Sequence, residues 1–323
     1  MTDLYGAIDL GGTNVRSIVA TLAGEIRGDD KRPSRTGEGL AGTLEALLAS
    51  LERACAEAGL VAGDLRGLGL DTPGWVDSES GVVPAAPQLV GWRDVPITGI
   101  LNERLGIPVR LENDANAAAL GENVFGAGRG TRHMLYITVS TGLGGGIIAD
   151  GKLYGGAKGS AGEIGHTVVD PNGPACLCGN NGCLEAFVSD MGIGRRAAEA
   201  VARGDSEVLA GYKEREVRIS ARMVAEAARA GDAASVAIYE NAGRYLGIAL
   251  ANAVNLLSPE AIILGGGMMA SKDLFLPRAE RVMRELSLSE PLKYVRLAEA
   301  ELGDRAGPLG MIARLAQLAG RSS

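Results

Sequence analysis

The chain is poor in aromatic residues, has no long apolar segment and carries no excess of positive charge, and each absence excludes a class of protein. It has only 2 tryptophans, 7 tyrosines and 3 phenylalanines. The longest helix-like apolar run, residues 246–257, is too short to span a bilayer. The 32 basic and 39 acidic residues give a formal net charge of −7, which offers no general attraction to nucleic acid or anionic membranes. The N-terminal residues lack the basic and then apolar segments of a secretory signal. We therefore expect a soluble, cytoplasmic protein with no nucleic-acid or membrane partner.

Glycine, in contrast, is abundant. It accounts for 48 of the 323 residues, about 15%, against roughly 7% in average usage. Tight turns and close backbone approaches are what glycine permits, so the chain favours these over bulky packing. The apolar share of 46% is ordinary for a globular protein. The length corresponds to about two domains of roughly 150 residues each.

Three of the four cysteines lie in one short segment. Cys176, Cys178 and Cys183 follow His166 and together offer three sulfurs and one nitrogen, a closed tetrahedral set suited to structural zinc. A disulfide framework would spread its pairs along the chain, so the clustering favours metal in a reducing compartment. A disulfide with one spare thiol is the alternative. Cys55 falls on the apolar face of an expected helix and is predicted to be a core residue.

The predicted strands and helices recur in the same order in two halves of the chain. In the first half, apolar runs and helical periodicity predict strands at residues 5–10, 15–22, 65–70 and 107–111 and helices at 40–55 and 115–125. Residues 71–77 and the rest of segment 73–94 are expected to form turns. At an offset of 131 the pattern restarts with a strand at 136–139, a glycine turn at 142–146 and a strand at 147–149, followed later by helices at 220–230 and 232–257 and a strand at 261–264. This repetition predicts an α/β fold with a mixed sheet flanked by helices in each half.

The repeated order also suggests where the domains lie. We expect a smaller N-terminal α/β domain at 1–118 and a larger one at 119–306 that carries the zinc-binding loop, 155–185. The helical periodicity near the C-terminus predicts that 307–323 packs back onto the first domain.

Three glycine-rich turns follow predicted strands. Glycines let backbone N–H groups approach a phosphate closely, and a carboxylate at a strand end can position Mg²⁺ through water. Each turn alone also fits an ordinary hairpin or loop, but three of them in two similar halves favour a cleft lined with backbone amides. The candidate nucleotide- and phosphate-binding residues are Asp9, Gly11, Gly12, Thr13, Asn14, Thr141, Gly142, Gly144, Gly266 and Gly267.

An Asn-Asp pair stands where a predicted strand ends and a helix begins. Asn113 and Asp114 are residue types that cap helices and suit the positive end of the helix dipole. The same position, at the carboxyl end of a strand in an α/β fold, suits a general base. From the residues alone, both the cap and the base remain open for Asp114.

Taken together and in this order, the motifs resemble those of the ROK (repressor, open reading frame, kinase) family of sugar kinases, most closely its bacterial glucokinases. Asp9-Leu10-Gly11-Gly12-Thr13 resembles the family's first phosphate motif. The stretch from 141–146 to 162–166 resembles the family signature, and the Cys-x-Cys-Gly-x-x-Gly-Cys-Leu-Glu string resembles its zinc loop.

The resemblance implies a two-domain, actin-like (ribonuclease H-like) kinase that closes around ATP, Mg²⁺ and a sugar. It favours Asp114 as the catalytic base. It implies that the sugar hydroxyls are contacted by Asn113, Asp114, Glu163, His166 and Glu185. His166 would then serve twice, with one ring nitrogen on zinc and the other donating to the sugar. Family habit also implies a homodimer or homotetramer.

The expected reaction is phosphorylation of glucose at its 6-hydroxyl by ATP. A kinase for N-acetylglucosamine, N-acetylmannosamine or fructose is the nearest alternative, because segment 84–89 lacks the Asn before Leu89 that many relatives carry. Polyphosphate is the alternative donor. A non-catalytic sugar sensor is a further alternative, against which Asp9 and Asp114 argue. The family's repressors carry a helix-turn-helix before the sugar-binding portion, and the first strand expected here, beginning by Leu4, leaves no room for one.

Overall fold

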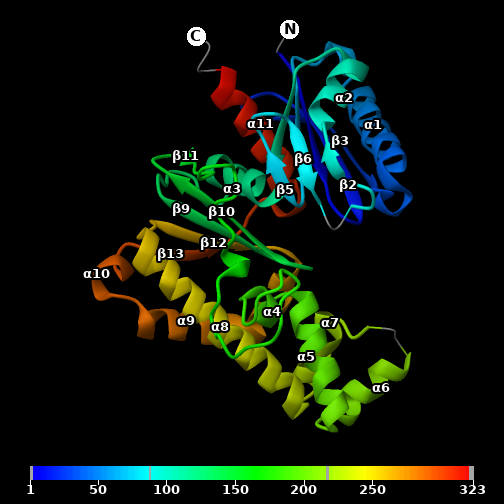
Figure 1. Ribbon diagram of the computed structural model, residues 1–323. Helices are drawn as coiled ribbons and strands as arrows, with labels where there is room; N and C mark the ends of the chain where they lie inside the picture. The colour runs from blue at the N-terminus through cyan, green and yellow to red at the C-terminus, as the bar shows by residue number, and fades with distance from the viewer. Residues whose placement is uncertain (1–2, 87–88, 216–217, 320–323) are drawn as a thin grey trace. The chain divides into compact units, whose positions relative to one another are not determined.

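The computed structural model describes residues 3–86, 89–215 and 218–319. The chain divides into two compact units (Figure 1). The first comprises Met1–Tyr136, Gly146–Gly162 and Ala300–Ser323, and the second comprises Ile137–Gly145 and Glu163–Glu299. The domain boundary expected near residue 118 lies inside a helix of the first unit, and the expected domains stay a prediction.

The first unit is built on a five-stranded mixed sheet. Its order is β3-β2-β1-β4-β8, with β1 antiparallel to β2 and parallel to β4. The strands are β1 (Tyr5–Leu10), β2 (Asn14–Ala20), β3 (Ile26–Pro33), β4 (Leu68–Thr72) and β8 (Val109–Asn113). Around it lie α1 (Gly39–Glu57), α2 (Ile97–Leu105), α3 (Asp114–Val124) and α11 (Ala306–Ala319), with short 3-10 turns at Thr36–Glu38, Ala62–Asp64 and Gly303–Arg305. Asp71 and Thr72 end β4, so the prediction of a turn at these two residues is wrong.

The side chains of β1 alternate between the two faces of the sheet, and a different helix covers each face. Ile8 and Leu10 pack in the core with residues of α1, whereas Ala7 packs with Met311 and Ile312 of α11. Asp9 therefore points to the face that α11 covers, because side chains on a strand alternate with period two. Helix α11, red in Figure 1, also packs closely on α3.

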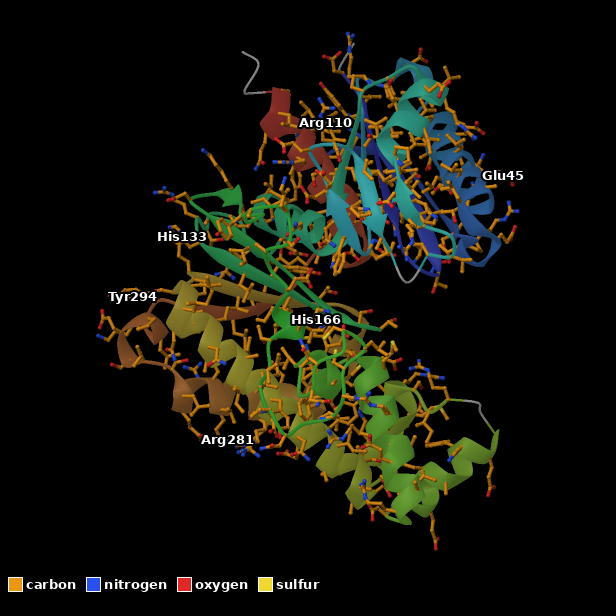
Figure 2. The ribbon with its side chains drawn as sticks, in the orientation of Figure 1. Glu45, Arg110, His133, His166, Arg281 and Tyr294 are labelled. Carbon is orange, nitrogen blue, oxygen red and sulfur yellow. The ribbon has the colours of Figure 1, made fainter. Side chains whose placement is uncertain are left out.

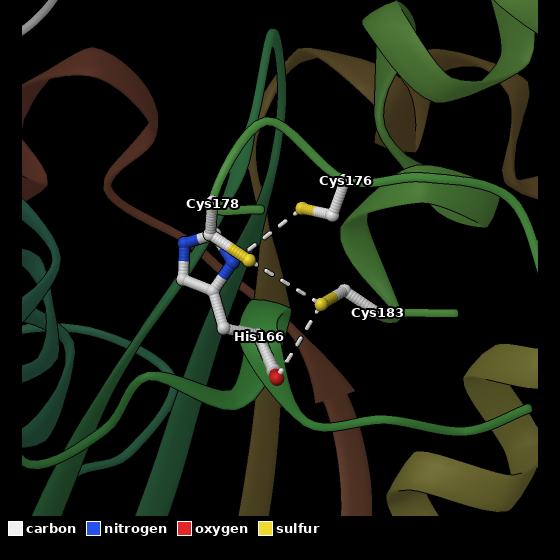
Figure 3. A group of neighbouring side chains, drawn as sticks. All are labelled: His166, Cys176, Cys178 and Cys183. Atoms are coloured by element: carbon white, nitrogen blue, oxygen red, sulfur yellow. Dashed lines mark hydrogen bonds between the residues drawn. The ribbon is translucent and has the colours of Figure 1, made fainter. Parts of the chain in front are cut away.

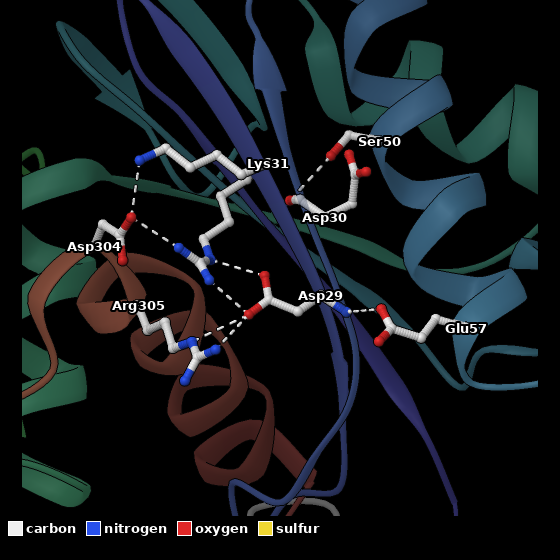
Figure 4. Close-up of polar contacts among 8 residues, drawn as sticks. Asp29, Asp30, Lys31, Ser50, Glu57, Asp304 and Arg305 are labelled. Atoms are coloured by element: carbon white, nitrogen blue, oxygen red, sulfur yellow. Dashed lines mark hydrogen bonds and ion pairs between the residues drawn. The ribbon is translucent and has the colours of Figure 1, made fainter.

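Strand β3 was not predicted because its residues are mostly polar. Ion pairs take the place of apolar packing there (Figure 4). Asp29 accepts hydrogen bonds from Arg16 and Arg305, at 2.6 and 2.8 Å at their shortest, and Lys31 pairs with Asp304 at 2.9 Å. The backbone N–H of Asp29 also donates to Glu57 of α1 at 3.0 Å. An edge strand with charged side chains discourages pairing with other chains.

A small three-stranded sheet forms where the sequence predicted turns. It consists of β5 (Trp75–Asp77), β6 (Val82–Ala85) and β7 (Arg93–Val95), in that order. Strands of three or four residues are too short to show a readable alternation, which is why segment 73–94 was misassigned. Val76, Val83 and Val95 bury this sheet against the core of the first unit.

A second five-stranded sheet repeats the order of the first. Its order is β11-β10-β9-β12-β13, with strands β9 (Met134–Val139), β10 (Leu143–Ala149), β11 (Lys152–Leu153), β12 (Ala261–Gly265) and β13 (Arg296–Glu299). The repeat predicted at an offset of 131 is thus confirmed in the topology. The predicted glycine turn at 142–146 is wrong in extent, because β10 already begins at Leu143. Gly146 is needed in the strand, since a Cβ there would lie 2.6 Å from the Cβ of Ala119.

Helices form most of the second unit. They are α4 (Glu185–Val188), α5 (Asp190–Arg203), α6 (Glu207–Arg215), α7 (Ala221–Arg229), α8 (Ala233–Leu257), α9 (Lys272–Leu286) and α10 (Ser289–Leu292), with 3-10 turns at Ile164–His166 and Gly267–Ser271. Gly243 and Gly247 let α8 approach α9, because a Cβ at either would lie within 2.6 Å of a carbonyl oxygen of α9. None of the helices in the described ranges has both the length and the apolar character needed to cross a membrane.

Candidate active site and metal centre

Four side chains of the second unit converge as the cysteine spacing predicted (Figure 3). The ligand atoms of His166, Cys176, Cys178 and Cys183 all lie within 4.8 Å of one another. The sulfurs of Cys178 and Cys183 are 3.6 Å apart, and the Cys176 sulfur is 3.7 Å from Nδ1 of His166. Two sulfurs that each lie about 2.3 Å from one zinc ion are at most about 4.6 Å apart. The geometry therefore fits a tetrahedral metal site.

The thiol chemistry also favours a cation. All four cysteines are free, so the disulfide alternative is not formed. A hydrogen bond from the Asn180 backbone lowers the pKa of Cys178 to about 7, whereas burial raises the pKa of Cys183 to about 12. A coordinating metal ion would deprotonate all three thiols, including Cys183, whose burial otherwise favours the neutral thiol. Cys55 is buried in the core of the first unit, as predicted.

The loop that carries the cysteines is held by its own turns. Cys176 N–H donates to the Asn180 carbonyl at 2.7 Å, and Gly182 N–H donates to the Pro174 carbonyl at 2.7 Å. Gly182 has a φ of 72°, and a Cβ there would collide with the Asp170 carbonyl. These backbone contacts shape the loop and bring its three cysteines to one side of His166.

Glu185 connects this loop with the second glycine turn. Its Oε2 accepts a hydrogen bond from the Leu143 N–H at 2.9 Å, and its Oε1 lies 3.9 Å from the Cys176 sulfur. A Cβ on Gly142 would lie 2.8 Å from the same Oε2, so a larger residue there would displace the Glu185 carboxylate. Gly165, next to His166, is also pressed against the Leu143 carbonyl. Glu185 thus contacts both the cysteine loop and the second glycine turn, which is the expected phosphate turn.

The second and third glycine turns lie side by side. Gly266 has a φ of 91°, and a Cβ there would lie 2.3 Å from the Val139 carbonyl, while a Cβ on Gly267 would lie 3.9 Å from Ser140 Oγ. The turn at Ser140–Thr141–Gly142 is closed by a hydrogen bond of 2.9 Å from Ser140 N–H to the Gly142 carbonyl. Gly144 lies inside β10 and not in that turn. Glu163, exposed, stands directly before the 3-10 turn that ends at His166.

In the first unit, the turn after β1 presents its backbone to solvent. Gly11 N–H donates to the Asn14 carbonyl at 2.9 Å, which closes the turn, and Gly12, Thr13 and Asn14 are exposed. Thr36 Oγ1 donates a hydrogen bond to the Gly12 carbonyl at 2.8 Å, which holds the turn in place. This arrangement is compatible with the phosphate-binding prediction, which it does not test.

The N-cap of α3 is Asn113 and not Asp114. Oδ1 of Asn113 accepts hydrogen bonds from the N–H groups of Ala115 and Asn116 at 3.0 and 3.2 Å. Asp114 begins α3, and one of its oxygens accepts from the Ala115 N–H at 2.8 Å. Burial raises the pKa of Asp114, and the hydrogen bond from Ala115 opposes that rise. The helix therefore does not need Asp114 as its cap.

Two buried carboxyl groups near Asp114 were missed by sequence reasoning. Glu112, only 3% exposed, accepts hydrogen bonds from Asn113 N–H at 3.1 Å, Asn116 Nδ2 at 3.2 Å and Ser78 Oγ at 3.3 Å. Asp71 is 0% exposed and lies beside Asp9. An acidic residue near the end of an otherwise apolar strand is the signal that could have identified both.

Burial raises the pKa values of Asp9, Asp71 and Asp114, and a hydrogen bond with Asp71 opposes the rise at Asp9. Burial raises the pKa of Asp9 to about 6, and the charges of Asp114 and Asp304 add to the effect. Burial raises the pKa of Asp71 well above its usual range, and Asp9, Asp114 and Glu112 add to it. Titratable groups with raised pKa values that share one edge of a sheet are typical of functional sites.

His133, the other of the chain's two histidines, is about half exposed, with Nε2 3.8 Å from Asp150 Oδ1, and is not one of the four clustered ligands, whose histidine is His166 (Figure 2). Segment 84–89, expected to read the far face of the sugar, contains Pro87 and Gln88, which lie outside the described residues.

Comparison with known proteins gives consistent matches over nearly the whole chain. The model of the ROK family matches residues 5–318. A glucokinase from Halalkalibacterium halodurans is 38% identical over 307 residues, which are 95% of this chain and 93% of that protein. A putative xylose repressor from Caldicellulosiruptor sp. (strain Rt8B.4) is 35% identical over 306 residues, which are 95% of this chain and 76% of that protein. The crystal structure of a ROK family glucokinase from Streptomyces griseus in complex with glucose and AMPPNP superposes with a TM-score of 0.80 at 35% identity, covering 98% of this chain and 99% of that one.

Proposed function

Because the chain belongs to the ROK family, we propose that it is a kinase that transfers the γ-phosphoryl group of ATP to the 6-hydroxyl of glucose. The similarity to two glucokinases supports the choice of reaction. The observation that carries the proposal is the division of roles at the start of α3. Asn113 caps the helix, which leaves the Asp114 carboxylate for acid–base chemistry.

The reaction would be an in-line phosphoryl transfer with Asp114 as general base. The sugar O6 forms a bond to the γ-phosphorus while the bond from that phosphorus to the β,γ-bridging oxygen breaks, and ADP leaves with the electron pair. Asp114 accepts the proton from O6 as the new bond forms. Positioning and charge stabilisation supply most of the rate, because little covalent chemistry falls to the protein.

Backbone amides would hold the phosphates. In the first unit these are the N–H groups of Gly11, Gly12 and Thr13, with Asn14 next to them. In the second unit they are those of Thr141, Gly142 and Gly144, and Gly266 and Gly267 would let adenosine lie close to the backbone. Mg²⁺ supplies charge neutralisation on the phosphates, and Asp9 is its proposed partner through water.

We assign the sugar contacts to Asn113, Asp114, Glu163, His166 and Glu185. We also assign structural zinc to the His166 cluster, where it would hold the loop and fix the histidine tautomer. Since Nδ1 of His166 faces the sulfurs, Nε2 is the nitrogen that would donate to a sugar hydroxyl. We place the enzyme in the cytoplasm as a homodimer or homotetramer, with ATP rather than polyphosphate as donor.

The substrate assignment predicts a clear preference for glucose. In a coupled ADP-release assay with ATP and Mg²⁺, kcat/KM for glucose should exceed that for mannose, fructose, N-acetylglucosamine and N-acetylmannosamine by about tenfold or more, a difference of about 1.4 kcal/mol in transition-state stabilisation. Polyphosphate in place of ATP is the matched control for the donor. A preference for an acetylated sugar would move the function to amino-sugar phosphorylation.

A non-catalytic sugar-binding regulator is the second candidate. The 35% identity to a putative xylose repressor favours it. Calorimetry with glucose and xylose distinguishes the two functions. Sugar binding without turnover on any of the five sugars, in folded protein with its metal, would support the regulator and contradict the kinase.

The raised pKa of Asp114 predicts the pH dependence. A general base acts in its ionised form, so kcat/KM falls as the pH drops through the pKa of Asp114 in the free enzyme. Because burial raises that pKa, the acid limb should lie above the ordinary Asp value of about 3.9. Circular dichroism over the same pH range is the control for unfolding. An acid limb at or below the ordinary value would contradict the assignment.

A further inference from the structure

Asp71 is a buried carboxyl group with no hydrogen-bond donor on either oxygen. It is 0% exposed, and neither Oδ1 nor Oδ2 accepts a hydrogen bond from a described residue. Buried carboxylates are almost always paired with a cation or with several donors. An ionised Asp71 would therefore be very unfavourable at this position, and the question is what this carboxyl does in the fold.

The neighbour of Asp71 is Asp9. The two residues are paired in register across the parallel strands β1 and β4, which places both side chains on the same face of the sheet. Their carboxyl groups lie within hydrogen-bonding reach of each other. The other charged groups that act on Asp71 are Asp114 and Glu112, both acidic. Asp9, in contrast, also feels the guanidinium of Arg16.

Helix α11 closes this site on the remaining side. A Cβ on Gly307, in the first turn of α11, would lie 3.1 Å from both oxygens of Asp71. Glycine thus leaves just enough room for the carboxyl group under the helix. Among the described residues, the only set of three or more metal-ligating groups is the His166 cluster, to which neither Asp71 nor Asp9 belongs.

We propose that Asp71 is a positioning residue that, as a neutral carboxylic acid, donates a hydrogen bond to the Asp9 carboxylate. Two facing carboxyl groups cannot both ionise, and one shared proton turns their repulsion into a hydrogen bond. Asp71, enclosed and without donors, keeps the proton, and Asp9, partly exposed and closer to Arg16, keeps the charge. The bond fixes the rotamer of Asp9 at the end of β1, beside the glycine turn. The catalytic consequence rests on the proposed function, in which Asp9 orients the Mg²⁺–nucleotide.

The test compares two isosteric replacements. Asp71→Asn keeps a donor, and kcat should stay within about threefold of wild type. Asp71→Leu removes the donor, and kcat should fall about 10- to 100-fold, the range typical for loss of a residue that orients a metal partner. The KM for the sugar should stay unchanged in both variants. The melting temperature of Asp71→Leu should fall by only a few degrees, because the variant loses a single hydrogen bond to Asp9, which is partly exposed. Loss of activity through unfolding would thereby be excluded.

Two readouts test the hydrogen bond without any kinase activity. The infrared difference spectrum of wild type minus Asp71→Asn at neutral pH should contain the C=O band of a neutral carboxylic acid. Calorimetry should show weaker Mg²⁺–ADP binding for Asp71→Leu and wild-type binding for Asp71→Asn. Asp205→Asn, which removes an exposed carboxylate of the second unit, should leave all readouts unchanged. If the wild type phosphorylated no sugar, the proposed function would fail while these two readouts still tested Asp71.

Three results would overturn the inference. The first is the absence of the neutral-acid band from the difference spectrum. The second is an Asp71→Asn variant as impaired as Asp71→Leu, which would mean that an ionised Asp71 is needed. The third is an Asp71→Leu variant with wild-type kcat and wild-type Mg²⁺–ADP affinity.

Discussion

Replacing Asp114 by Asn should lower kcat by about 10²- to 10⁴-fold, the usual contribution of a general base. The amide keeps the shape of the side chain but cannot accept the proton from the sugar hydroxyl. Sugar and nucleotide should still bind, so the effect should appear in kcat rather than in KM. The measurement is the ADP-release assay with saturating glucose and ATP.

The fold should tolerate this change. Asp114 accepts one backbone hydrogen bond, from its own neighbour Ala115, while Asn113 provides the cap of α3. The lost charge–dipole interaction at a helix N-terminus is worth about 0.3–1 kcal/mol, and burial already opposes the charge. The melting temperature and zinc content should therefore match wild type. Asp205→Asn is again the matched control. Wild-type turnover by Asp114→Asn would exclude Asp114 as the base.

The parts of the site that could be predicted from the sequence depend on local chemistry. A strand, a glycine turn and a second strand lie within residues 5–20, so β1 and β2 were found within two residues of their ends. The metal cluster was predicted because its ligands lie on one short stretch of chain and zinc demands a fixed donor set. The repeat at an offset of 131 predicted two similar sheets, since a duplicated pattern carries its topology with it.

The parts that were missed depend on contacts distant in sequence. Strand β3 is held by Asp29 and Lys31, whose partners include Arg305 and Asp304 near the other end of the chain. The small sheet of β5, β6 and β7 has too few residues for its alternation to be read. A turn was predicted at Asp71 because nothing nearby in the sequence shows that Asp9 and α11 enclose this residue. The sequence can mark such a residue as acidic at the end of an apolar strand, but only the fold shows which groups surround it.

Disrupting the metal cluster should have the second large effect. Wild-type protein should contain one zinc per chain by elemental analysis, and Cys183→Ser should lose most of it, because Cys183 is fully buried and its sulfur lies 3.6 Å from that of Cys178. Ligand loss should weaken glucose binding by about 10- to 100-fold, since His166 would lose the contact that orients its ring. Calorimetry with glucose, alongside the zinc assay, measures both effects.

The contacts of Glu185 predict that this damage extends to the nucleotide side. Glu185 lies 3.9 Å from the Cys176 sulfur and accepts the hydrogen bond from Leu143 N–H at the phosphate turn. When the cysteine loop loosens, that turn should lose its support, and the KM for ATP should rise together with that for glucose. Cys55→Ala is the matched control, because it removes a buried thiol from the core of the first unit and should leave zinc and both KM values unchanged. A Cys183→Ser variant with full zinc content, or with lost zinc and unchanged glucose affinity, would contradict the structural role assigned to the metal. A rise in the KM for glucose alone would confine that role to the sugar side, because the phosphate turn would then keep its shape without the loop.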